Sequence, residues 1–99
     1  MSVAQQCKPF KPGKIVATRA VDAFISTPSI QTEIHACMRR HLKGDWGELC
    51  ATDVRLNDAA THDGSRILSS YTVGPAGTRI WIITEADRST TTVLFPSEY

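Results

Sequence analysis

The sequence has no apolar run of the roughly 18 residues that a membrane helix needs, and it does not open with the basic and then apolar segment of a signal peptide. It also has no large excess of charge, because eleven Lys and Arg residues face ten Asp and Glu residues, for a net charge of +1. Proteins that hold nucleic acid through bulk charge carry a clear basic excess. These absences predict a cytoplasmic protein without membrane association, and they do not favour direct nucleic-acid binding.

Cysteine is scarce, and the three cysteines do not form a C-x-x-C pair. An odd count without such a pair argues against a disulfide framework and against a cysteine-based zinc site, and it fits a reducing compartment. His35, Cys37 and His41 lie close in sequence, but helix residues two apart point to different faces. The sequence therefore predicts neither a metal site nor a cofactor.

The chain has 99 residues, which is enough for one domain. Its 41% of apolar and 21% of charged residues are an ordinary globular mixture rather than that of a disordered chain. Residues 1–13 hold Pro9 and Pro12 and show almost no periodicity. We therefore expect a flexible or extended N-terminal arm over residues 1–13 and a single α+β domain over residues 14–99.

Helical periodicity marks one long segment, in which Ile30, Ile34 and Cys37 recur at the spacing of a helix. A Ser-Thr-Pro start precedes it and basic residues end it, so a main helix is predicted over Pro28–Lys43. Glu48–Ala60 is less regular and predicts a second, short helix. A helical turn is expected over Asp22–Ser26.

Segments rich in β-branched residues predict the strands, which are Lys14–Val21, Arg66–Val73, Thr78–Glu85 and Thr90–Phe95. The last three are joined by connections of hairpin length. The expected fold class is α+β, in the order β-α-(α)-β-β-β. In this arrangement a small antiparallel meander, joined by the N-terminal strand, packs against one main helix.

The middle strand of the meander is apolar on both faces, with Ile80 and Ile82 on one side and Trp81 and Ile83 on the other. The main helix can cover only one of these faces. The other face is expected to lie against the second helical segment or against a partner chain, so a homodimer is one possibility.

Three stretches of the sequence carry a resemblance to known proteins. They are Gly44–Gly47 (GDWG), Arg66–Tyr71 (RILSSY) and the ending Arg79–Tyr99. The chain from Lys14 to Tyr99 resembles an uncharacterised family of small plasmid- and mobile-element-related proteins. This resemblance implies that the protein belongs to mobile DNA that either conflicts with a host or accommodates to it. It implies no activity and no catalytic residues.

Two polar segments are candidates for binding a protein partner. The predicted hairpin tip holds Glu85, Asp87 and Arg88, and the segment after the main helix holds Asp45 and Trp46. Charged groups at a turn can anchor a partner, and tryptophan is frequent in binding hot spots. The alternatives are a polar turn in which Asp87 accepts a backbone hydrogen bond, and a tryptophan that plugs the end of a thin core.

A different reading is a metal-independent ribonuclease toxin of the RelE or barnase kind, with His41, Tyr71, Arg79 and Glu85 as the candidate catalytic residues. General acid–base cleavage of RNA needs two proton-transfer groups about one ribose apart and a cation for the phosphate. These four residues supply the types, but no spacing rule joins them. His41 also follows the apolar seam of the main helix, so a buried core histidine is the alternative.

The sequence lacks a phosphate-binding glycine loop, a nucleophile elbow and a zinc-protease motif. It therefore favours a non-enzymatic binding protein of a mobile genetic element, without catalytic residues, over an enzyme. The expected role is to dock on and inhibit a host defence complex, in the manner of anti-CRISPR or anti-restriction proteins.

Overall fold

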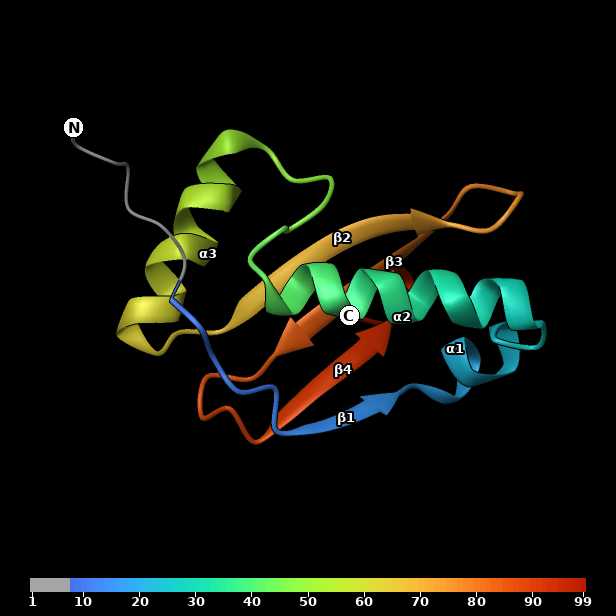
Figure 1. Cartoon of the computed structure of the whole chain (residues 1–99), viewed down its shortest axis with the longest axis horizontal. Helices are drawn as coiled ribbons and strands as arrows, with labels where there is room; N and C mark the ends of the chain where they lie inside the picture. The colour runs from blue at the N-terminus through green and yellow to red at the C-terminus, as the bar shows by residue number, and fades with distance from the viewer. Residues whose placement is uncertain (1–7) are drawn as a thin grey trace.

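The computed structural model describes residues 8–99, which form a four-stranded sheet with helices on one face and at its edges (Figure 1). The elements in chain order are β1 (Lys14–Ala17), α1 (Arg19–Phe24), α2 (Pro28–Leu42), α3 (Ala51–Asp63), β2 (Ile67–Val73), β3 (Thr78–Thr84), β4 (Thr90–Leu94) and a 3-10 turn (Pro96–Glu98). The predicted α+β class is confirmed, and each expected helix and strand is present with shifts at its ends.

The sheet is mixed rather than wholly antiparallel, with the strand order β1-β4-β3-β2. The β2–β3 and β3–β4 hairpins are antiparallel as expected, but β1 runs parallel to β4, with Lys14 opposite Thr90 and Ala17 opposite Val93. The antiparallel expectation is therefore wrong for β1. The reason is that no short turn joins β1 to its neighbour, so the long excursion through the helices leaves its direction free.

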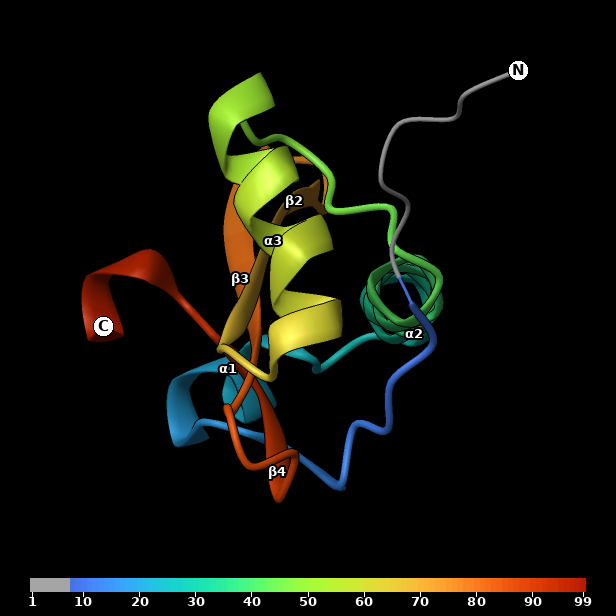
Figure 2. The same ribbon diagram turned by 90° about the vertical axis from the view of Figure 1, so that its left-hand side faces the viewer.

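The main helix α2 lies along one face of the sheet (Figures 1 and 2). Its N-cap is Thr27, whose hydroxyl accepts a hydrogen bond from the Ile30 amide, and Pro28 occupies the first helical position. Ile30, Ile34 and Cys37 point from α2 into the core, as their spacing predicted. Each buried isoleucine contributes about 2 kcal/mol of hydrophobic free energy.

The helix α3 starts at Ala51, after residues 46–48 have paired with the edge of β2. The Ser70 amide donates to the Trp46 carbonyl, and the Glu48 amide donates to the Ser70 carbonyl. Gly47 lies between them with φ +75°, and a Cβ on it would lie 2.0 Å from the Ser70 carbonyl oxygen. Only glycine fits this approach.

The sheet face opposite α2 is covered partly by the C-terminal segment of the same chain (Figure 2). The Tyr99 ring lies edge-on to Trp81 with 5.6 Å between centroids, and the Arg66 guanidinium lies over the Tyr99 ring. Ile83 and Leu94 are only 3% and 7% exposed on the single chain. Ile83 and Leu94 are therefore already buried within the single chain, and the homodimer stays a prediction.

Residues 8–13 are extended but packed. The Lys8 amide donates to the Thr61 hydroxyl, and Phe10 joins the small core cluster of Trp46 and Ile67. An aromatic side chain therefore ties residues 8–13 to the core, and the flexibility expected of the arm stays a prediction. The first seven residues of the predicted arm lie outside the described residues.

Candidate functional site

His41 is fully buried at the last turn of α2 and faces the sheet. Its Nδ1 is hydrogen-bonded to the Ser69 hydroxyl of β2, and its Nε2 lies 2.8 Å from the Thr84 hydroxyl of β3. The rings of Phe10 and Trp46 lie edge-on to the imidazole. Burial lowers the pKa of His41 to about 4, so the ring is neutral near pH 7.

The hydrogen bonds of His41 continue across the sheet. The Thr84 and Thr91 hydroxyls lie 2.7 Å apart, and Thr91 donates to the Pro12 carbonyl at 2.7 Å. This series of hydrogen bonds links α2, β2, β3, β4 and the segment before β1. Each of its polar groups would be costly to bury without a partner. His41 is therefore the core histidine that the sequence left as the alternative to a catalytic base.

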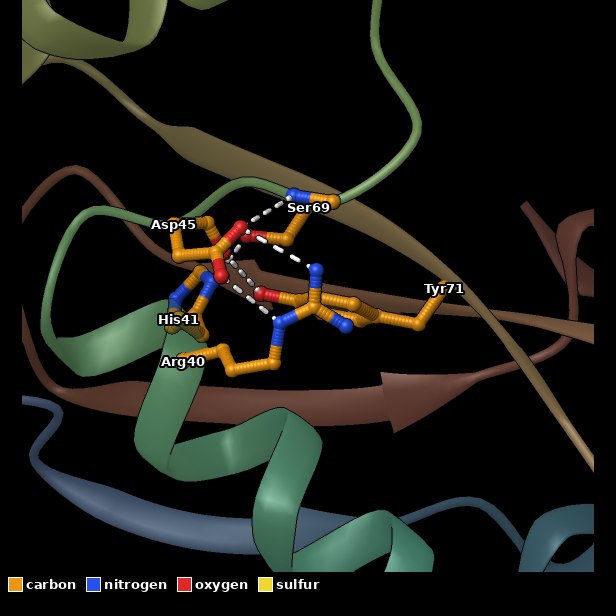
Figure 3. Close-up of polar contacts among 6 residues, drawn as sticks. Arg40, His41, Asp45, Ser69 and Tyr71 are labelled. Atoms are coloured by element: carbon orange, nitrogen blue, oxygen red, sulfur yellow. Dashed lines mark hydrogen bonds and ion pairs between the residues drawn. The ribbon is translucent and has the colours of Figure 1, made fainter.

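Tyr71 is also committed to the interior, beside an ion pair (Figure 3). Its hydroxyl donates to the Asp45 carbonyl at 2.7 Å, and the Arg40 guanidinium lies 4.9 Å from the centre of its ring. Arg40 forms two hydrogen bonds to the Asp45 carboxylate, at 2.8 and 3.1 Å. Burial raises the pKa of Tyr71, and the hydrogen bond from Arg40 lowers the pKa of Asp45.

The four candidate ribonuclease residues do not share a site. Tyr71 and His41 are buried on the α2 side of the sheet. Arg79 is exposed, alternates with Ile80 along β3 and therefore faces the opposite side, where it bonds Glu48 and Ser70. Glu85 is exposed at the hairpin after β3. These four residues of the described chain therefore do not combine an acid, a base and a phosphate-binding cation in one site.

Trp46 is not a surface anchor, because it is only 3% exposed. Its indole N–H donates to the Asp58 carboxylate of α3 at 2.9 Å, and its ring packs with Phe10 and Ile67. Trp46 is therefore not presented on the surface of the single chain, and its role in binding a partner stays a prediction. The alternative, a tryptophan that plugs the end of a thin core, describes its position.

Arg88 is likewise used inside the fold, although its guanidinium was a candidate partner anchor. It donates to the Ala60 carbonyl near the end of α3 at 2.9 Å and to the Ser65 carbonyl at 2.7 Å. Its backbone has φ 59°, a left-handed conformation that non-glycine residues adopt rarely. The side chain thereby ties the β3–β4 hairpin to α3, and the partner role predicted for it is not available to these donors.

The remaining candidates, Asp45, Glu85 and Asp87, are exposed. Asp87 accepts a hydrogen bond from the Ser89 amide, as the polar-turn alternative proposed, and hydrogen bonding at Ser89 lowers its pKa. These carboxylates are accessible to a partner. They are the part of the predicted binding set that stays on the surface.

Two polar residues of α3, Asn57 and Asp58, make structural hydrogen bonds that the sequence did not predict. The Asn57 side chain is 6% exposed, donates to the Leu68 carbonyl at 2.6 Å and accepts from the Leu68 amide at 3.2 Å. Asp58 accepts the indole hydrogen bond of Trp46. Asn57 lies one helical turn before Ala60 and Thr61, on a face of α3 that is only weakly apolar. The sequence pattern therefore does not distinguish a buried hydrogen-bonding residue from a solvated one at this position.

The described part of the chain contains no helix long and apolar enough to cross a membrane. Within residues 8–99, no three His, Cys, Asp or Glu side chains are grouped as metal ligands, and Cys37 and Cys50 are free thiols.

The chain was compared with models of protein families, with curated proteins and with solved structures, and none of these comparisons finds a significant match.

Proposed function

We propose that this chain is a non-enzymatic protein-binding module that works in the cytoplasm. The observation that supports this proposal is the position of the four candidate catalytic residues, which are either buried and hydrogen-bonded or far from one another. His41 and Tyr71 are buried with their polar atoms occupied, while Arg79 and Glu85 lie apart from them. Surface charge and an open sheet edge are then the features left for recognition.

The partner in this proposal is a host defence complex, which the module inhibits in the manner of anti-CRISPR or anti-restriction proteins. The support for a mobile-element setting is the resemblance of Gly44–Gly47, Arg66–Tyr71 and Arg79–Tyr99 to the plasmid-related family. The exposed carboxylates Glu85 and Asp87 supply a charged tip that a nucleic-acid-processing complex could bind in place of phosphate.

A transformation assay tests this proposal. Cells with an active CRISPR or restriction system that targets a plasmid are compared with cells in which that system is inactive. Expression of the chain should raise plasmid recovery at least about tenfold in the first cells only. The double variant Glu85→Gln/Asp87→Asn should lose this effect, and Asp53→Asn, an exposed acid of α3, should keep it.

Equal recovery with and without the chain, for CRISPR and restriction systems alike, would contradict the proposed target. Degradation of RNA by the purified chain, abolished by Arg79→Ala or Glu85→Ala, would contradict the non-enzymatic role.

A further inference from the structure

The two edges of the sheet differ in how their backbone groups are used. At the β2 edge, the amide and the carbonyl of Leu68 are both bonded by the Asn57 side chain, and those of Ser70 are bonded by residues 46–48. An incoming strand would find these outward groups already paired. The β2 edge is therefore closed at Leu68 and Ser70.

The β1 edge is open. The Lys14 and Thr18 amides donate to carbonyls of Ser89 and Val93, toward β4. Backbone groups alternate in direction along a parallel strand, so Ile15 and Ala17 turn their N–H and C=O groups outward. Within residues 8–99 no hydrogen bond to these outward groups is present, and the Ile15 side chain is 51% exposed.

An apolar groove of about 420 Å³ lies beside this edge, between β1 and α2. Its apolar lining includes Ile15, Ala17, Ile25, Ile34, Met38 and Val93. Ile15 and Ala17 face it because they are in register with Thr91 and Val93 on the α2 side of the sheet. Lys14 and Val16 alternate to the other side.

Basic residues predominate in the sequence around β1, while the Glu98 carboxylate accepts a hydrogen bond from the Thr18 hydroxyl just after the strand. Residues 1–21 contain Lys8, Lys11, Lys14 and Arg19 and no acidic residue. Lys11 precedes β1, Lys14 is its first residue and Arg19 follows it, and all three are exposed. Asp22 is the acidic residue that lines the groove.

We propose that the β1 edge binds an extended segment of a partner protein in which acidic and apolar residues alternate. The segment would add a fifth strand, with its backbone on the outward groups of Ile15 and Ala17. Its apolar side chains would enter the groove toward α2, and its carboxylates would face Lys14 and the basic flanks. This inference rests on the proposed function only in taking the occupant to be a protein.

The same charges select against a second copy of the chain on this edge. Pairing β1 with itself would bring Lys14 and Arg19 of both copies together, and like charges at a strand pair are unfavourable. An acidic strand gains from the same groups. Charge complementarity is therefore the reason to choose this partner.

The experiment follows backbone amide shifts of the full chain by NMR while a peptide is added. The probe is acetyl-Val-Glu-Val-Glu-Val-Glu-amide, and the control peptide has Lys in place of each Glu. We expect the Glu peptide to shift the amides of Ile15 and Ala17 and of the groove. We expect it to bind at least about tenfold more tightly than the Lys peptide.

Three variants test the geometry. Ala17→Pro removes one outward N–H without removing a bond to β4, and it should abolish binding. Lys11→Glu/Lys14→Glu should reverse the preference for the two peptides, and this test stands if Ala17→Pro fails to fold. Arg55→Glu makes the same kind of charge change on exposed α3 and should leave binding within about twofold of the wild type.

The proposal is overturned if the shifts fall outside β1 and the groove, or if both peptides bind alike. It is also overturned if the wild type dimerises through β1 without peptide, or if a single-stranded oligonucleotide shifts the same amides at lower concentration. A negative transformation assay with positive peptide binding would refute the defence target and leave the β1 site standing. The reverse result would refute the β1 site alone.

Discussion

At the scale of single residues, side chains that usually signal chemistry are used here to join elements. The imidazole of His41 bridges hydroxyls of β2 and β3, and the Arg88 guanidinium bonds carbonyls near the end of α3. Removing one partner from such a buried network leaves another polar atom unpaired, at a cost of about 1–3 kcal/mol. Histidine and arginine are common in active sites, but here both side chains form hydrogen bonds that hold elements of the fold together.

The lowered pKa of His41 predicts how stability depends on pH. The unfolded chain binds a proton on His41 near its ordinary pKa of about 6.5, whereas the folded chain does so only near pH 4. Stability from this group is therefore complete above about pH 6.5 and falls as the pH drops from there to 4. The total loss is about 3 kcal/mol, at a slope of up to about 1.4 kcal/mol per pH unit.

Urea unfolding at several pH values between 7.5 and 4.5 measures this slope. The double variant His35→Gln/His62→Gln removes the two exposed histidines and should keep it. A flat stability curve in that variant would show that His41 is not the group responsible.

At the scale of elements, the β2 edge is closed by side chains and loops rather than by another strand. Asn57 pairs both backbone groups of Leu68, and Gly47 lets residues 46–48 reach Ser70. The segments Gly44–Gly47 and Arg66–Tyr71 meet at this edge, where Gly47 pairs with Ser70. Their contacts give these two segments a structural role at the β2 edge.

Asn57→Ala should lower the free energy of unfolding by about 2–3 kcal/mol, because it leaves the amide and the carbonyl of Leu68 unpaired. The neighbouring Leu56 is 62% exposed, so Leu56→Ala should change stability by less than about 0.5 kcal/mol. Urea unfolding of both variants checks this difference. Equal effects would mean that Asn57 does not close the edge.

At the scale of the whole molecule, two core clusters lie along one face of the sheet. One gathers around Ile34, Tyr71 and Ile82, and the other around Trp46 and Ile67. His41 lies between aromatic residues of the second cluster and the strands of the first. This continuity predicts that residues 14–99 unfold as one unit.

Single-tryptophan variants test this cooperativity. Trp46→Phe leaves Trp81 to report on the face opposite α2, and Trp81→Phe leaves Trp46 to report on the α3 side. Within each variant, fluorescence and far-ultraviolet circular dichroism should give the same urea midpoint. Separate midpoints would show that the α3 side unfolds independently.

Local pattern was sufficient for the element types and most of their positions. Thr27 and Pro28 mark the start of α2, and β-branched runs with hairpin-length connections mark β2, β3 and β4, because these signals act between near neighbours in sequence. The buried His41 was also foreseen as an alternative, since it follows the apolar seam of the helix.

The parallel pairing of β1, the edge role of Asn57 and the separation of His41 from Arg79 were settled by contacts between segments far apart in sequence. Residue type does not encode which distant backbone group a side chain will meet. The use of each polar group, in packing or on the surface, therefore follows from how the segments assemble.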